Sequence, residues 1–408
     1  MSNYSDELGQ TSIEYLEQDV EIENEEFQPF DPEKISIDTK PITMDTCLRR
    51  LEQGTIILNP DFQRDEVWTL EKKCRLIESL MLKIPLPMFY VSADERGNFY
   101  VVDGLQRLST IRSFVLGDEY LKTKDQSLKG NGLSLSNLEF WGDLYNDKRF
   151  IDLPINIQNR ILETGFTFTI INPGTPEDVK RNIFKRINTG GEPLFPQEIR
   201  HALYIGESTR FLLKLSKKLE FLEATSGSIT SNRMMDREII LRFLAFAIRS
   251  FKDYPKSNDM DTFLSDTMRI INVMPSLSGK AADKVFKDDL SREQIIVNDI
   301  SILEDMFIKA MKRAKKIFNE HAFRKSHPEK RRAPINKALF EVWGTLLSQL
   351  SSSQFQRLMV NKRAFIEEHS KLLEEDYFNY IISRNSLKYQ SVVDRYQKLT
   401  KLLYKYIK

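Results

Sequence analysis

The sequence has few of the residues that would mark a disulfide-stabilised or membrane-spanning protein. Its only two cysteines, Cys47 and Cys74, lie in stretches with helical patterning and lack ligand-like spacing. The longest apolar run, around Ile84 to Val91, has about eight residues with two prolines, too few to cross a bilayer. No basic, apolar leader stands at the N-terminus. We therefore expect a cytoplasmic protein without membrane contact.

The common phosphate-binding loops are also missing. Neither the Walker pattern GxxxxGK[ST] nor the fingerprint GxGxxG occurs. Charge is close to balanced over the 408 residues, with a net value of +1, but it is unevenly distributed. Residues 1–40 hold twelve acidic side chains against two lysines, a net charge of −10, and the remainder therefore carries +11. A basic body of this kind is compatible with nucleotides or nucleic acid as partners.

The hydrophobic pattern divides the chain into three parts. Residues 1–40 are acidic and poor in periodic apolar positions, which indicates a flexible arm. In residues 41–206 short strands alternate with helices, including a hairpin around the turn DERGN and helices capped by Thr43 and Thr69. Residues 207–408 show helical spacing alone, and their stretch EIILRFLAFAIRSF is apolar almost all round, typical of a core helix. We expect an α+β domain followed by an all-helical one.

The stretch FYVVDGLQRLSTI, from Phe99 to Ile111, reads as a strand, a turn and a helix with an arginine in its first turn. Helix capping alone can explain Asp103 and Gln106, which have the spacing of a capping box. Arg107 needs another explanation, because a cation at a helix N-terminus is unfavourable without a nearby anion. A nucleotide phosphate and a carboxylate such as Glu198 are the two candidates for that anion.

Two further stretches could contribute to a site. The loop NPDFQRDEVW carries Gln63 and Arg64 between a strand and a helix, where they could contact a ligand. The alternative is that this loop only connects the two elements and has no binding role. The segment FKRINTGGEPLFPQEIRHAL has a Gly-Gly loop whose backbone N–H groups could approach a phosphate. The alternative is a purely structural role, in which the segment ends one helix and Pro196 starts the next.

Taken together, five blocks resemble the GmrSD-type restriction-endonuclease N-terminal domain family over roughly residues 40–250. The blocks are PDFQRDEVW, LIESLMLKIPLPMFYV, YVVDGLQRLSTI, FKRINTGGEPLFPQEIRHAL and DREIILRFLAF. That family is similar to the ParB and sulfiredoxin nucleotide-binding fold, a mixed sheet with helices. The resemblance implies nucleotide binding, and in several members NTP hydrolysis, coupled to defence against modified or foreign DNA.

The resemblance also implies roles for individual residues. Asp103, Gln106 and Arg107 are the expected catalytic residues, with Asp103 holding Mg²⁺ or the attacking water, Gln106 or Gln63 orienting that water, and Arg107 and Arg64 on phosphate oxygens. The expected nucleotide-binding residues are Gln63, Arg64, Gly104, Arg107, Ser109, Thr110, Arg186, Asn188, Thr189, Gly190, Gly191 and Arg200. Mg²⁺ is the one expected cofactor; zinc, haem and flavin are not expected.

This chain departs from the larger members of the family, which often append an HNH nuclease module. Its four histidines, His201, His321, His327 and His369, are scattered, and His201 is expected on a helix surface. We therefore expect no HNH chemistry in this chain. A separately encoded nuclease partner and a homo-oligomer are both compatible with this expectation.

The basic stretch from Lys309 to Pro334 holds ten Lys and Arg against two Glu. A solvated face and a DNA-backbone contact explain it equally well. The DNA candidates are Lys312, Arg313, Lys315, Lys316, Arg331 and Arg332.

Three functions follow from these observations. The first is an NTP-binding and NTP-hydrolysing defence protein that senses DNA. The second is a DNA-binding regulatory module whose nucleotide pocket does not hydrolyse. The third is a nuclease built directly on the ParB-like fold.

Overall fold

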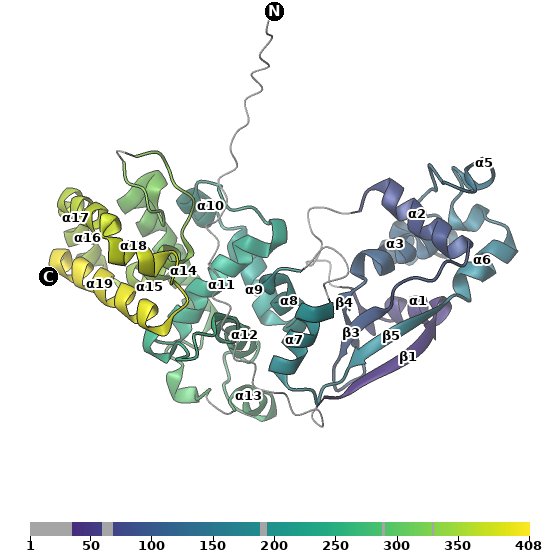
Figure 1. Cartoon of the computed structure of the whole chain (residues 1–408), viewed down its shortest axis with the longest axis horizontal. Coiled ribbons are helices and arrows are strands. Elements are labelled where there is room, and N and C mark those ends of the chain that lie inside the picture. The colour runs from purple at the N-terminus through teal and green to yellow at the C-terminus, as the bar shows by residue number, and fades with distance from the viewer. Residues whose placement is uncertain (1–34, 59–67, 188–193, 288–289, 329) are drawn as a thin grey trace, which may run out of the picture. The chain divides into compact units, whose positions relative to one another are not determined.

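The computed structural model describes residues 35–58, 68–187, 194–287, 290–328 and 330–408. The chain separates into two compact units, and the division falls between Leu203 and Tyr204. The described residues up to Leu203 form the sheet unit, and those from Tyr204 onward form the helical unit (Figure 1). The strands and the long helices together make an α+β protein, as the sequence predicted.

The sheet unit is built on a mixed sheet of five strands in the order β1-β5-β3-β4-β2. The pairs β1/β5 and β3/β4 are antiparallel, and β3/β5 and β2/β4 are parallel. The predicted hairpin is confirmed, since β3 and β4 pair across the turn 94–98. The strands are β1 (Ile37–Thr43), β2 (Ile56–Ile57), β3 (Phe89–Ala93), β4 (Phe99–Asp103) and β5 (Gly165–Ile171).

Helices cover both faces of this sheet. On one face, Val102 and Ile171 form a buried cluster with Phe184 of α7 and Ile199 of α8. Alternation along β5 turns Phe168 to the other face, the side on which Figure 1 shows α1, α2, α3 and α6. The helices of this unit are α1 (Met44–Glu52), α2 (Leu70–Met81), α3 (Leu105–Leu116), α4 (Asp118–Thr123), α5 (Gly142–Tyr145), α6 (Ile155–Leu162), α7 (Glu177–Ile187) and α8 (Pro196–Leu203).

Local sequence signals set several helix ends as expected. The side chains of Thr43 and Thr69 accept hydrogen bonds from the backbone of Thr46 and Lys72, which confirms both as caps. The first strand, by contrast, was missed: β1 begins at Ile37, so residues 37–40 belong to the sheet and not to an arm. The strand lies at the sheet edge and almost all its residues are exposed, so it shows no apolar alternation.

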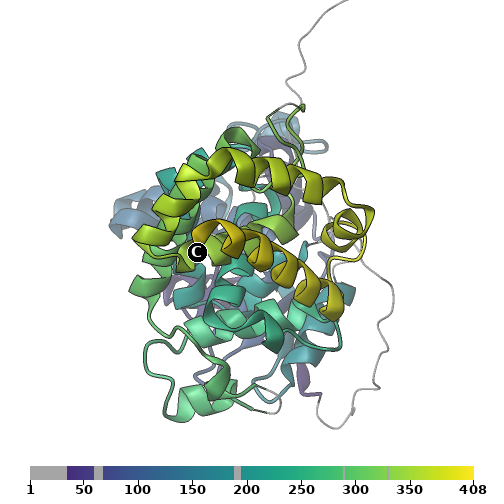
Figure 2. The same cartoon turned by 90° about the vertical axis from the view of Figure 1, so that its left-hand side faces the viewer.

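The helical unit packs around α11, which is buried along nearly its whole length, as its apolar sequence predicted. The helices α9, α12, α14 and α15 all contact it. Figure 2 brings the last helices of the chain, coloured yellow, to the front, with the C-terminus among them. The helices of this unit are α9 (Glu207–Ser216), α10 (Leu219–Thr225), α11 (Met235–Ile248), α12 (Met260–Ile271), α13 (Lys280–Val285), α14 (Ile300–Phe318), α15 (Lys337–Gln349), α16 (Ser352–Val360), α17 (Lys362–Glu374), α18 (Asp376–Ile382) and α19 (Tyr389–Ile407).

Two expectations about single residues have different outcomes. Both Cys47 and Cys74 are free thiols in helices, as predicted, and both are buried. His201 was expected on a helix surface, but it is 0% exposed, because α8 is buried from Gln197 to Ala202.

Within the described part of the chain, no helix combines the length and apolarity needed to cross a membrane.

Candidate functional site

The turn between β4 and α3 is tightly constrained. Asp103 ends the strand, Gly104 is the N-cap of the helix, and α3 begins at Leu105. Gly104 has φ +95°, in the left-handed region that side chains rarely adopt. A Cβ atom at this position would also lie 2.2 Å from Cδ1 of Phe89. Only glycine fits here without moving the ring of Phe89.

Arg107 closes this turn against the loop that leads into β3. Its Nη2 donates to Oδ2 of Asp103 at 2.8 Å and to the carbonyl oxygen of Met88 at 3.2 Å, and its Nη1 donates to the carbonyl oxygen of Pro87. The guanidinium lies over the ring of Phe89, with 4.5 Å from its carbon to the ring centroid. Burial lowers the pKa of Arg107, and the adjacent Asp103 partly offsets that effect. One side chain thus joins the strand end, the helix and the loop.

These contacts correct the capping interpretation of the motif. Asp103 does not cap α3, because Gly104 occupies the N-cap position and no side chain bonds there. The anion beside Arg107 is Asp103, whereas Glu198 accepts a hydrogen bond from the backbone N–H of Phe195 at 2.7 Å. The side chain of Arg107 is only 11% exposed, so its charge depends on these partners.

The turn leaves polar groups open to a ligand. The Asp103 side chain is 41% exposed, and no described residue donates a hydrogen bond to its second oxygen, Oδ1. The first N–H groups of α3 lie beside it and are capped by no side chain among the described residues. Such N–H groups carry partial positive charge and favour anions. A partly exposed carboxylate and an uncapped helix N-terminus therefore lie next to each other in one turn.

The remaining residues expected to bind nucleotide divide into three groups. Ser109 is half-buried in α3, but Thr110, one residue further, is 2% exposed and therefore inaccessible. Arg200 is buried in α8, which packs on β4, and its Nε donates to Oε1 of Gln197 at 2.9 Å. The third group lies outside the described residues: Gln63, Arg64, Asn188, Thr189, Gly190 and Gly191. Arg186 belongs to α7, but its side chain is also outside the described part of the chain.

The expected DNA-contacting residues belong to the helical unit. Lys312 and Lys316 are exposed on α14, and Lys312 pairs with Glu220 at 3.2 Å. Arg331 is exposed, while Lys315 and Arg332 are half-buried. Arg313 differs from these, because it is 7% exposed and its Nη1 donates to the carbonyl oxygens of Leu347 and Leu350. Arg313 therefore ties α14 to the end of α15 and does not face solvent.

Sequence reasoning missed the groups that hold the turn in place. The carbonyl oxygens of Pro87 and Met88 belong to the loop before β3, and the ring of Phe89 belongs to the first residue of that strand; none of them was assigned a role. The signal was present in the two prolines of KIPLPMF, since proline favours extended backbone whose carbonyl groups stay free of local bonds.

A second missed group is Glu78 of α2, which supports the loop before α5. Its two carboxylate oxygens accept hydrogen bonds from the backbone N–H groups of Glu139, Phe140 and Trp141 at 2.8–2.9 Å. Burial alone would raise the pKa of Glu78, but these three bonds outweigh it and the net pKa is lowered.

The donor set of the turn fits Mg²⁺ better than a metal held wholly by protein. Among the described residues, no three His, Cys, Asp or Glu side chains gather as a metal site. Mg²⁺ is usually bound by one or two carboxylates together with substrate phosphates and water. Oδ1 of Asp103 is a ligand of that kind.

The domain is an α+β unit whose strand-to-helix turn presents a carboxylate beside an uncapped helix N-terminus. Residues 47–205 match the family model described as GmrSD restriction endonuclease, N-terminal domain. The match confirms the resemblance for the four blocks inside this segment and relates it to restriction systems. The fifth block, residues 236–246, lies outside the matched segment. Comparisons with curated proteins and with solved structures gave no match.

Proposed function

We propose that the sheet unit binds a nucleoside triphosphate with Mg²⁺ at the turn formed by Asp103, Gly104 and Arg107. The observation that carries this proposal is the open oxygen of Asp103 beside the uncapped N-terminus of α3. The helix N–H groups suit a phosphate, and the carboxylate suits the magnesium ion that accompanies it. When bound, Mg²⁺ supplies positive charge that balances the phosphates.

Arg107 acts in this proposal as a positioning residue. Its donors are engaged by Asp103 and by the carbonyl oxygens of Pro87 and Met88, so its direct role is to hold the carboxylate. The bond to Oδ2 fixes the orientation of Asp103 and leaves Oδ1 without a donor among the described residues. Gln106, half-buried in the first turn of α3, has an amide group that can orient water or a phosphate oxygen.

NTP hydrolysis coupled to DNA binding is the function that accounts for three features together: this site, the relation to restriction systems, and the basic helical unit. Lys312, Lys316 and Arg331 are exposed and can contact the DNA backbone without reading sequence. Binding of that kind weakens steeply with salt. A separately encoded nuclease is a fitting partner for a chain that couples nucleotide turnover to DNA.

A nucleotide switch without turnover is the second candidate, and one observation favours it. The cation of the turn, Arg107, is already bonded to protein groups, so it does not face a transferring phosphate in this structure. Stabilisation of charge in the transition state is the main work of phosphoryl-transfer sites.

Phosphate release decides between the two candidates. The full chain is incubated with ATP or GTP and Mg²⁺, with and without duplex DNA, and with the Asp103→Asn variant in parallel. Release that DNA stimulates and that Asp103→Asn abolishes supports hydrolysis. Nucleotide binding without release supports the switch. Absence of binding by either nucleotide contradicts both.

The DNA contact is tested separately by its salt dependence. Charge reversal in Lys316→Glu with Arg331→Glu is expected to lower DNA affinity and to flatten its dependence on salt concentration. A matched control is Arg363→Glu with Arg75→Glu, which reverses two exposed arginines that pair with Glu367 and Glu71. Equal loss in both proteins would show only a general effect of net charge.

A further inference from the structure

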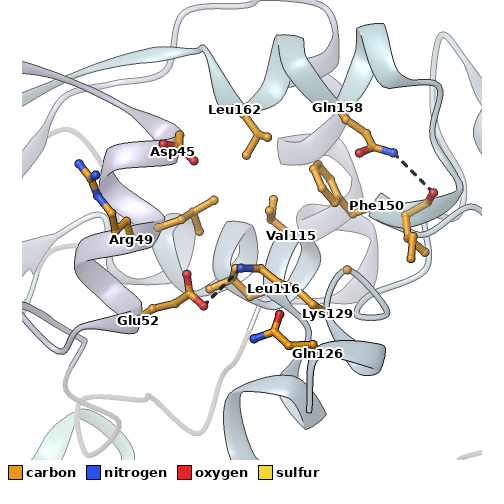
Figure 3. A pocket seen from close by; sticks show the side chains of 13 residues that line it. Asp45, Arg49, Glu52, Val115, Leu116, Gln126, Lys129, Phe150, Gln158 and Leu162 are labelled. Carbon is orange, nitrogen blue, oxygen red and sulfur yellow. Dashed lines mark hydrogen bonds and ion pairs between the residues drawn. The ribbon is translucent and has the colours of Figure 1, made fainter. Parts of the chain in front are cut away.

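A pocket of about 410 Å³ lies in the sheet unit at the C-terminal end of α3, far along the helix from Arg107 (Figure 3). This volume is in the range of small-molecule sites. Its apolar floor combines the end of α3 with the 3₁₀ turn Phe150–Asp152. The floor residues are Val115, Leu116 and Phe150, and Leu48 and Leu162 add apolar surface from the walls.

One stripe of α1 forms a wall of this pocket. Asp45, Leu48 and Glu52 follow one another at spacings of three and four residues, so they share one face of the helix. On the other side, Gln158 and Leu162 are four residues apart on α6 and line the pocket in the same way. Helices on both sides make the walls rigid, and rigid walls favour binding because less conformational freedom is lost when the ligand binds.

The polar atoms of the pocket that remain available to a ligand are mostly hydrogen-bond acceptors. Nε2 of Gln158 donates to the carbonyl oxygen of Leu153 at 2.8 Å, which leaves its Oε1 as the open group. Nε2 of Gln126 lies 3.5 Å from the hydroxyl oxygen of Tyr120, which likewise leaves Oε1. The carboxylate of Asp45 is exposed, and no described residue donates a hydrogen bond to it.

The two cations of the lining do not balance these acceptors. Nζ of Lys129 lies 3.5 Å from Oε1 of Glu52 and 5.1 Å from the centre of the Tyr120 ring, so its charge is already paired. Arg49 is exposed, and Figure 3 shows its guanidinium pointing away from the other lining side chains. The carbonyl end of α3 adds partial negative charge at the floor.

We propose that this pocket binds a small organic amine, an apolar body that carries one or more protonated or hydrogen-bond-donating nitrogen atoms. The apolar part packs on Phe150, Val115 and Leu162, and the nitrogen donates to Asp45 or to the open amide oxygens. The site is separate from the nucleotide turn, so it does not depend on the function proposed above.

Calorimetric titration of the full chain with three probes tests this site. The probes are phenethylamine, spermidine and 3-phenylpropionate, the last a carboxylate of similar size. We expect saturable binding of an amine at one site and none of the carboxylate. Asp45→Asn is expected to weaken the amine by about tenfold, the effect of losing one charge-assisted hydrogen bond. Leu162→Trp fills the pocket and is expected to abolish binding.

Asp38→Asn is the matched control, because Asp38 is an exposed aspartate on β1 and does not line the pocket. It should bind the amine as the unchanged chain does, and thermal melting establishes that all three variants are folded. Equal binding of the carboxylate, or equal amine binding by folded Leu162→Trp, would overturn the proposal. So would the absence of binding by both amines up to about 10 mM, a concentration that detects weak complexes.

Discussion

Two arginine–carboxylate sites, one in each unit, differ in what water can reach. In the helical unit, Glu341 of α15 accepts a hydrogen bond from Arg395 of α19 and lies 3.5 Å from Arg242 of α11. Both Glu341 and Arg395 are 0% exposed. In the sheet unit, Asp103 pairs with Arg107 but is 41% exposed and keeps one oxygen open. The closed site joins three helices, whereas the open site can still take a ligand.

This comparison separates two uses of the same chemistry. A carboxylate enclosed between two arginines holds charge that would be costly to bury alone. A carboxylate held at one oxygen by a buried arginine is fixed in orientation, and its other oxygen stays available for a ligand. Substitutions should therefore affect stability in the helical unit and ligand binding at the turn of the sheet unit.

The largest expected effect comes from Glu341→Ala. It leaves Arg395 and Arg242 without the carboxylate between them, and we expect the free energy of unfolding to fall by about 3–5 kcal/mol. Urea denaturation measures the loss, and hydrogen exchange should place it in α15 and α19. Glu367→Ala removes an exposed partner of Arg363 on α17 and should cost at most about 0.5 kcal/mol. Similar losses in both variants would contradict the distinction.

Gly104→Ala should have the next largest effect. A methyl group here meets both the left-handed φ and the ring of Phe89, so we expect a loss of about 2–3 kcal/mol in the sheet unit. Gly97 is the matched control, with φ +80° and no heavy atom within 4 Å of the place that an added methyl group would occupy. Gly97→Ala should cost only about 1 kcal/mol. If urea denaturation shows equal losses, the close contact with Phe89 does not matter.

Glu78→Gln should cost about 1–2 kcal/mol, because an amide NH₂ group cannot accept the N–H bonds that the carboxylate accepts. The same contact predicts a pH dependence. Since the folded pKa of Glu78 is lowered from 4.5, its stabilisation is complete above that pH and is lost as the pH falls through the folded value. Denaturation between neutral pH and pH 3 should show a smaller decline for Glu78→Gln than for the unchanged chain. An identical decline would contradict this role.

The smallest stability effects should come from Asp103→Asn and Glu71→Gln. Glu71 pairs with Arg75 on α2 at the same four-residue spacing and the same 2.8 Å distance, with both side chains more than half exposed. Each substitution should change the free energy of unfolding by about 1 kcal/mol or less. A loss several times larger for Asp103→Asn in thermal melting would mean that the turn is held for stability alone.

Much of the architecture follows from local sequence signals. The caps Thr43 and Thr69, the hairpin and the core helix α11 depend on residues within a few positions of one another, and all were predicted. The edge strand β1 was not, because its pairing with β5 joins residues more than a hundred positions apart and leaves little to bury.

At the candidate site, the sequence located the turn but not its internal bonding. Spacing alone could not distinguish Asp103 as a cap from Asp103 as the partner of Arg107, because a left-handed Gly104 decides between them. Glu78 was equally hidden, since the N–H groups it accepts from lie more than sixty residues away. The pocket draws its lining from five separate segments, and no local pattern marks it.

The most direct test of the central claim is a binding isotherm for ATP and GTP with Mg²⁺ on three proteins: the unchanged chain, Asp103→Asn and Glu71→Gln. We predict saturable binding of one nucleotide per chain, weakened about tenfold or more by Asp103→Asn and unchanged by Glu71→Gln. Binding that is equally strong in folded Asp103→Asn would contradict the assignment of the open carboxylate as part of the nucleotide site.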